Sequence, residues 1–280
     1  MKMKVGFIGF GEVASILARG LMGQGVEVFT CLEGRTDRTK ELARSMEVKL
    51  CINNRELADT MDMILSAVIP SQVVRVAQEV GEIKGIYVDL NNVSPNTVQE
   101  ALNHVGDSNT VDASIMGSIR KKGLKVKIIA SGGAAKEFAQ LNDYGMDIEV
   151  IGSETGQASA IKMLRSAYTK GVSALLLESL HAAYQMGIDE EVFKYISQTE
   201  GSGFQESAIS RMTSSLYHAR RRSEEMEEVV KMISQETEPF MSRATLEFFQ
   251  VMDEKIGKLD KRPANMHQVF QKLEGSGHEG

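Results

Sequence analysis

Three polar side chains of different chemistry lie within one turn of a predicted helix near the middle of the chain. On a helical wheel, Lys162, Arg165 and Ser166 fall within an arc of about 100°. Thr169 and Ser173 continue this polar stripe, while small and apolar residues occupy the opposite side. A cation beside a hydroxyl could bind an anionic or carbonyl-bearing ligand, and a lysine there could transfer a proton. The alternative is an ordinary solvated helix face.

A glycine-rich turn near the N-terminus indicates a second kind of chemistry. Residues 4–10 form a continuous apolar run typical of a buried parallel strand, and a helical pattern follows the turn. Gly9 permits the tight turn, and Gly11 lets backbone N–H groups approach a pyrophosphate at the helix N-terminus. Strand, glycine turn and helix in this order predict a dinucleotide site, against the alternative of a simple strand–helix turn. The residues predicted to bind the cofactor here are Gly9, Phe10, Gly11, Glu12 and Val13.

The residues after the second predicted strand, 26–32, indicate which dinucleotide is bound. An NAD site usually places a carboxylate there to accept from the ribose hydroxyls, and Glu33 is near enough to do so. Arg35, Thr36 and Arg38 follow at once, and such cationic and hydroxyl groups suit a 2′-phosphate. We therefore predict NADP as the cofactor, with NAD read by Glu33 as the less favoured alternative.

Strand and helix patterns alternate through the first half of the chain, and only helical periodicities follow. This order predicts an α/β protein, with an N-terminal Rossmann-type doubly wound sheet followed by an all-α C-terminal domain. We expect an NAD(P)-binding domain over 1–153, an all-α domain over 154–261 and a polar, flexible tail over 262–280. The predicted strands cover 4–10, 26–32, 48–52, 63–69, 85–90, 109–113, 126–130 and 147–151, and the later helices 157–186, 189–200, 204–219, 221–236 and 238–258.

Several motifs occur in the order expected of a known family. They are GFGEVA at 9–14, AVIPS at 67–71, DLNNVSP at 89–95, DASIMGSI at 112–119 and GQASAIKMLRS at 156–166. Over about residues 4–172 the chain resembles the β-hydroxyacid dehydrogenases, which are relatives of 6-phosphogluconate dehydrogenase. The resemblance places the catalytic lysine of that family on Lys162. Ser166 stands where the family has an asparagine, and Met116 stands at the serine position of its substrate loop.

The resemblance also implies roles for residues that the spacing alone does not assign. It implies that Lys162 moves a proton to or from the substrate oxygen and that Ser166 hydrogen-bonds the same oxygen. Val68, Ile69, Pro70 and Asn91 are implied as further cofactor contacts. The implied substrate-binding residues are Ser114, Met116, Gly117, Ser118 and Arg165, and Arg120 or Lys121 is implied as a further cation beside them. The run 120–122 otherwise reads as a solvated turn before Gly123.

The expected function is NADP-dependent hydride transfer between the nicotinamide and a small hydroxy acid or aldehyde acid. Two alternatives stay open, an imine reductase on the same scaffold and a non-catalytic NADP(H)-binding module. A homodimer is expected, because the polar stripe of the long helix turns apolar after Ser173 at Leu176, Leu177 and Leu180.

Composition excludes several other classes of function. The chain is 42% hydrophobic and 25% charged with a net charge of −6, which is typical of a soluble globular protein and argues against nucleic-acid or acidic-membrane partners. Two cysteines give no disulfide framework, and the five histidines share no metal-ligand spacing, so no metal is expected. With no secretory segment and no long apolar run, we expect a cytoplasmic protein.

Overall fold

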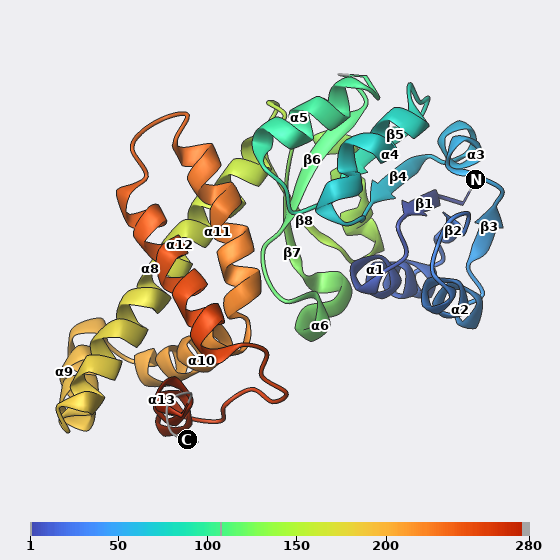
Figure 1. Ribbon diagram of the computed structural model, residues 1–280. Coiled ribbons are helices and arrows are strands. Elements are labelled where there is room, and N and C mark those ends of the chain that lie inside the picture. The colour runs from blue at the N-terminus through green and yellow to red at the C-terminus, as the bar shows by residue number, and fades with distance from the viewer. Residues whose placement is uncertain (1, 107, 276–280) are drawn as a thin grey trace. The chain divides into compact units, whose positions relative to one another are not determined.

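The computed structural model describes residues 2–106 and 108–275 (Figure 1). The chain divides into two compact units, Met1–Lys162 and Met163–Gly280, and the division falls inside the long helix α8 (Gln157–Gln185). None of the described helices is both long enough and apolar enough to cross a membrane.

The first unit is built on one eight-stranded sheet. The spatial order of its strands is β3-β2-β1-β4-β5-β6-β7-β8, and every neighbouring pair is parallel except β6 with β7. The order reverses between β1 and β4, which is the position where open α/β sheets bind dinucleotides. The strands are β1 (Lys4–Ile8), β2 (Glu27–Cys31), β3 (Lys49–Cys51), β4 (Met63–Ser66), β5 (Ile86–Asp89), β6 (Thr110–Ile115), β7 (Lys127–Ser131) and β8 (Asp147–Gly152).

Helices cover both faces of this sheet, as expected for a doubly wound fold (Figure 1). Each face of the sheet has its own apolar core, and successive side chains of β1 point into one core and then the other. Phe7 packs with α1 on one face, and Ile8 packs with α3 and α4 on the other. The predicted fold class is confirmed. One face carries α1 (Glu12–Gly23), α2 (Asp37–Ser45), α6 (Ile119–Lys122) and α7 (Ala135–Phe138), and the other carries α3 (Asn54–Thr60), α4 (Val73–Val80) and α5 (Pro95–Asn103).

Local sequence explains where several of these helices begin. The side chains of Thr36, Asn53 and Ser94 each accept a hydrogen bond from a backbone N–H in the first turn of the following helix. The structure differs from the sequence prediction at a short segment. Residues 120–122 belong to the one-turn helix α6 rather than a turn, and α7 is followed directly by the 3₁₀ helix η3 (Ala139–Tyr144). Two further 3₁₀ turns are η1 (Pro70–Gln72) and η2 (Gly123–Lys125).

The second unit is all-helical in its described residues, as predicted. It comprises most of α8 with α9 (Asp189–Glu200), α10 (Phe204–Tyr217), α11 (Ala219–Ile233), α12 (Phe240–Ile256) and α13 (Met266–Glu274). Its core gathers apolar side chains from five of these helices, among them Leu177, Met212, Met226, Phe249 and Phe270. The helices α11 and α12 pack side by side along much of their length.

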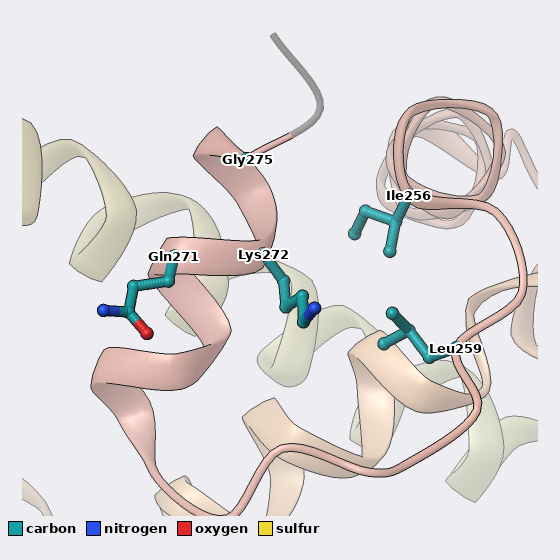
Figure 2. A pocket seen from close by; sticks show the side chains of 5 residues that line it. All are labelled: Ile256, Leu259, Gln271, Lys272 and Gly275. Atoms are coloured by element: carbon teal, nitrogen blue, oxygen red, sulfur yellow. The ribbon is translucent and has the colours of Figure 1, made fainter. Parts of the chain in front are cut away.

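The helix α13 lies in the stretch where the sequence predicted a flexible tail. Asn265 caps it by accepting a hydrogen bond from the Gln268 N–H, and Val269 and Phe270 are fully buried. Beside it is a hollow of about 330 Å³ that is also lined by Ile256 and Leu259; Figure 2 shows the Lys272 side chain extending toward these two residues. Residues 266–274 are therefore part of the folded unit, and the end of the expected tail, 276–280, lies outside the described residues.

Candidate functional site

The glycine turn after β1 has the geometry that a bound pyrophosphate requires. Gly9 has a φ of +83°, and a Cβ there would lie 2.3 Å from the carbonyl oxygen of Ala67. Gly11 precedes α1, and no heavy atom lies within 4 Å of the position where its Cβ would be. The helix N-terminus therefore faces open space lined by backbone, which fits an anionic phosphate group. Phe10 is buried against Phe7, so only its backbone is available, and the Glu12 carboxylate pairs with Arg120.

The loops after β4 and β5 are joined by the side chain of Asn91. Its Oδ1 accepts from the Val68 N–H at 2.7 Å, and its Nδ2 donates to Asp89 at 2.9 Å and to the Ser66 hydroxyl at 3.2 Å. The structure thus brings two predicted cofactor residues, Val68 and Asn91, together at the switch point. The Asn91 side-chain amide is hydrogen-bonded within the protein, so it holds the shape of the loop after β4. Ile69, which follows Val68 in that loop, is exposed.

The end of β2 carries the groups predicted to read the cofactor ribose. The buried Nε of Arg35 has no hydrogen-bond partner among the described residues, whereas buried polar atoms are normally paired. Thr36 uses its hydroxyl to cap α2, and both Arg38 and Glu33 are exposed. The segment after β2 thus carries two guanidinium groups, Arg35 and Arg38, and one carboxylate, Glu33.

Two buried carboxylates lie side by side on neighbouring strands, Asp89 at the end of β5 and Asp112 within β6. Asp89 and Asp112 are register partners, and Asp112 holds the start of α8. Its oxygens accept from the Ser159 backbone N–H at 2.9 Å and from the Ser159 hydroxyl at 2.7 Å. The Ser131 hydroxyl accepts from the Ala158 N–H at 3.2 Å and lies 3.4 Å from Asp112. Together these groups cap the N-terminus of α8 and fix it to the sheet.

The sequence analysis did not predict the hydrogen bonds by which Asp112 holds Ser159, here called the clamp. A charged residue inside the apolar strand pattern at 109–113 was the available signal, because an aspartate is rarely buried unless it is paired. The clamp matters because Lys162 follows Ser159 by three residues on α8, close to one helical turn. Asp112 therefore places the helix that carries the predicted catalytic lysine.

The charges of this cluster influence one another. Burial raises the pKa of Asp89 to about 6, although its hydrogen bonds from Asn91 oppose the rise. The neighbouring Asp112 raises that pKa further, and the positive charge of Lys162 lowers it. Burial also raises the pKa of Asp112, against the effect of its hydrogen bonds from Ser159. Lys162 is half-buried and lies within electrostatic reach of Asp89.

The predicted substrate loop falls into a buried part and an exposed part. Ser114 is fully buried within β6, and its hydroxyl has no partner among the described residues. Met116 pairs its N–H with the Lys127 carbonyl oxygen at 2.8 Å, and the exposed Gly117 and Ser118 follow. Gly117 and Ser118 are thus the members of this set that a ligand can reach directly.

In the second unit, Ser166 contacts a lysine that sequence reasoning did not single out. Lys170 donates to the Ser166 hydroxyl and pairs with Glu225 at 2.7 Å. Glu225 also pairs with Arg221 at 2.8 Å. Burial lowers the pKa of Lys170, whereas the negative charge of Glu225 raises it. The Lys170 ammonium group is therefore stabilised by the Glu225 carboxylate. The (i, i+4) spacing of Ser166 and Lys170 was the signal in the sequence that could have predicted their contact. Arg165, a predicted substrate-binding residue, is exposed.

Comparison with known proteins identifies two family patterns in the chain. Residues 4–92 match the family described as NADP oxidoreductase coenzyme F420-dependent. Residues 183–252 match a domain of unknown function, DUF1932.

Three similar proteins bear on the assignment. A solved structure of the conserved protein MTH1747, described as of unknown function and structurally similar to 3-hydroxyacid dehydrogenases, is 49% identical with a TM-score of 0.83, covering 90% of this chain and 97% of that one. An uncharacterized 28.5 kDa protein of Methanothermus fervidus is 41% identical over 254 residues, covering 90% of this chain and 100% of the relative. The 2-(hydroxymethyl)glutarate dehydrogenase of Eubacterium barkeri is 24% identical over 207 residues, covering 69% of this chain and 68% of that enzyme.

The sheet, the glycine turn and these similarities define an NAD(P)-binding protein with the 3-hydroxyacid dehydrogenase fold. Within that class, the chain belongs to the family of 3-hydroxyacid dehydrogenase-like proteins in which an NAD(P)-binding domain precedes a DUF1932 helical domain.

Proposed function

We propose that the protein is an NADP-dependent oxidoreductase that interconverts a small hydroxy acid and the corresponding aldehyde acid, with Lys162 as the acid/base. The observation that carries the proposal is the clamp of Asp112 on Ser159, because it fixes Lys162 on a helix whose start is tied to the sheet. The similarity to a 2-(hydroxymethyl)glutarate dehydrogenase supports a substrate that carries both an alcohol and a carboxylate.

The dinucleotide would be held by the chain's backbone and by one guanidinium. Gly9, Gly11 and the N-terminus of α1 would hold the pyrophosphate, and Arg35 would bind the 2′-phosphate. When bound, the nicotinamide supplies or accepts the hydride. Val68, Ile69 and Pro70 would line its ribose, in the loop that Asn91 holds in place.

The remaining steps belong to the protein's own side chains. Lys162 gives a proton to the developing alkoxide during reduction and removes one from the hydroxyl during oxidation. Ser166 hydrogen-bonds the same oxygen in the role that an asparagine has in the resembling family. The substrate carboxylate is bound by the N–H and hydroxyl groups of Gly117 and Ser118, with Arg165 as a further cation.

A substrate panel tests the reaction class. Purified protein is incubated with NADP⁺ and 3-hydroxy acids, or with NADPH and aldehyde acids or cyclic imines, and cofactor absorbance is followed. The expected result is turnover of hydroxy or aldehyde acids that the Lys162→Met variant loses. Turnover of imines alone would support an imine reductase instead, and NADPH binding without turnover of any compound would support a non-catalytic module.

Cofactor preference is tested by titration with NADPH and NADH. We expect NADPH to bind more tightly, and Arg35→Ala to weaken its binding by about 1.5–3 kcal/mol through loss of a charge-assisted phosphate contact. NADH binding should change little. The matched control is Arg44→Ala, at the far end of α2. Tighter binding of NADH by the unaltered protein would contradict the assignment and indicate Glu33 as the ribose reader.

The second unit supports a homodimer. Large apolar side chains are exposed along α8 at Leu164, Tyr168 and Leu175 and on α12 at Val251, with exposed fractions of 52%, 69%, 60% and 55%. Val251 also lines a groove of about 620 Å³, together with side chains of α8, α12 and α13 such as Leu177, Phe248 and Leu273. Exposed apolar side chains repeated along one face of a helix, as at Leu164, Tyr168 and Leu175, often meet another protein surface, and two copies of one chain would supply it.

A further inference from the structure

The two cysteines of the chain meet at the ends of adjacent strands. Cys31 is the last residue of β2 and Cys51 the last residue of β3, and the two are partners in the parallel register. Both side chains pack in the same apolar cluster, with Leu57 and Ala58 of α3. They therefore lie on the same face of the sheet, which is the condition for their sulfur atoms to approach each other.

The spacing of strands satisfies the geometry of a disulfide. Neighbouring strands lie about 4.8 Å apart, and disulfide-linked residues have Cα separations of about 4.4–6.8 Å. The Cys31 Sγ donates a weak hydrogen bond to the Ile52 carbonyl oxygen at 3.5 Å, so its thiol is directed at the residue after Cys51. Both thiols are free in the structure. Because the two residues are already register partners, closing a bond between them does not require the strands to slide.

The two thiols differ in access. Cys31 is buried, with only 3% of its surface exposed, whereas Cys51 is partly exposed at the edge strand of the sheet. An oxidant from solution therefore reaches Cys51 first, and Cys31 is the group placed to react with it afterwards.

We propose that Cys31 and Cys51 form a dithiol site that small disulfides oxidise to an intramolecular disulfide between β2 and β3. The Cys51 thiolate attacks one sulfur of a disulfide such as oxidised glutathione, and one glutathione leaves as its thiolate. Cys31 then attacks the Cys51 sulfur of this mixed disulfide, and the second glutathione leaves. Two protein thiols are oxidised, one glutathione disulfide is reduced to two thiols, and the two protein protons end on the released glutathiones.

The surroundings make this reaction slow at neutral pH. Burial raises the pKa of the Cys51 thiol, and the nearby Glu56 carboxylate and Cys31 raise it further, so little thiolate is present. The site therefore responds to a sustained change of thiol–disulfide balance rather than to a brief one. Cys31 lies two residues before the segment 33–38, but the dithiol site stands independently of the proposed cofactor role of that segment.

Mass spectrometry of the whole chain tests the site. Folded protein is incubated with millimolar oxidised glutathione at mildly alkaline pH, quenched, unfolded and alkylated with N-ethylmaleimide. The expected product is lighter by two hydrogen atoms, takes up no alkylating agent and yields a peptide pair joined through Cys31 and Cys51 that dithiothreitol separates. A time course should show a mixed disulfide on Cys51 before the closed product.

Two variants distinguish the roles of the thiols. Cys31→Ser should stop at the mixed disulfide on Cys51, and Cys51→Ser should leave Cys31 unreacted while the protein stays folded. Circular dichroism checks that each variant is folded, and the time course of the unaltered protein gives the same order of events without any substitution. Disulfides between chains, a persistent mixed disulfide in the unaltered protein, or two thiols that stay alkylatable would each overturn the proposal.

Discussion

Lys162 is the side chain on which the proposed chemistry depends, and its role predicts a separation of two effects. Lys162→Met should lower turnover by a factor of about 10² to 10⁴, the usual range for one positioned proton donor. NADPH affinity should barely change, because the pyrophosphate is assigned to Gly9 and Gly11. Both quantities are measured on one preparation. Turnover near that of the unaltered protein would contradict the mechanism, and joint loss of binding and turnover would indicate a structural or cofactor role.

Asp89 predicts a pH dependence of stability. Its pKa is about 6 in the folded protein and about 3.9 in an unfolded chain, so between these values the folded state keeps a proton that the unfolded state has lost. The contribution of Asp89 to stability is therefore fully present below about pH 4 and is lost, by about 3 kcal/mol, as pH rises through 6. Asp89→Asn should flatten this fall, measured by urea unfolding at several pH values.

The pH profile of Asp89→Asn is interpreted against a control variant and against the contribution of Asp112. Asp143→Asn, at an exposed position, should leave the profile unchanged. Part of the fall should persist in Asp89→Asn, because the pKa of Asp112 is also raised. Below about pH 4 the variant should be less stable than the unaltered protein, since an amide offers one acceptor oxygen to the two donors of Asn91. Parallel profiles for Asp89→Asn and the unaltered protein would refute the assignment.

At this scale the sequence predicts residue types better than their partners. Gly9, Gly11 and Arg35 could be proposed as cofactor residues from the sequence, because glycine turns and arginines have a local meaning. The Asp112–Ser159 contact joins residues 47 positions apart, and the Lys170–Glu225 contact joins helices α8 and α11. No local pattern records such pairs, since they arise only when the elements have packed.

Among the elements, the turn from β1 to α1 predicts opposite results for its two glycines. Gly9→Ala forces a residue with a Cβ to a φ of +83° and against the Ala67 carbonyl oxygen, so the protein should lose at least about 1–3 kcal/mol of stability. Gly11→Ala meets open space and should cost less than about 1 kcal/mol, yet its methyl group should weaken NADPH binding. Unfolding and cofactor titration of both variants check this. Tight NADPH binding by Gly11→Ala would argue against a pyrophosphate there.

The helix α8 shows what periodicity can and cannot predict. The wheel correctly separates a polar stripe from an apolar one, but the polar Lys170 and Ser173 are buried while the apolar Tyr168 and Leu175 are exposed. Periodicity tells which residues share a face and not what that face meets. Buried Lys170 is accommodated because Glu225 and Ser166 satisfy its ammonium group.

For the whole molecule, the alternation of strands and helices was enough to predict the sheet and the change to an all-helical second half. The helix α13 was missed because its apolar residues Val269, Phe270 and Leu273 are few among polar neighbours. Their spacing is helical, yet only the core of the second unit gives such a short amphipathic segment a reason to fold.

The exposed apolar stripe of the second unit leads to a prediction about assembly. Leu175→Arg places a charge on the proposed dimer surface of α8, where it would be desolvated without a partner, so dimerisation should weaken by at least about 3 kcal/mol. Light scattering and sedimentation at micromolar concentration should show a dimer for the unaltered protein and a monomer for the variant. Leu50→Arg is the matched control, since Leu50 is similarly exposed, at 54%, but lies on β3 of the first unit. A clean monomer for the unaltered protein, or dissociation by both variants alike, would remove the second copy as the partner of this surface.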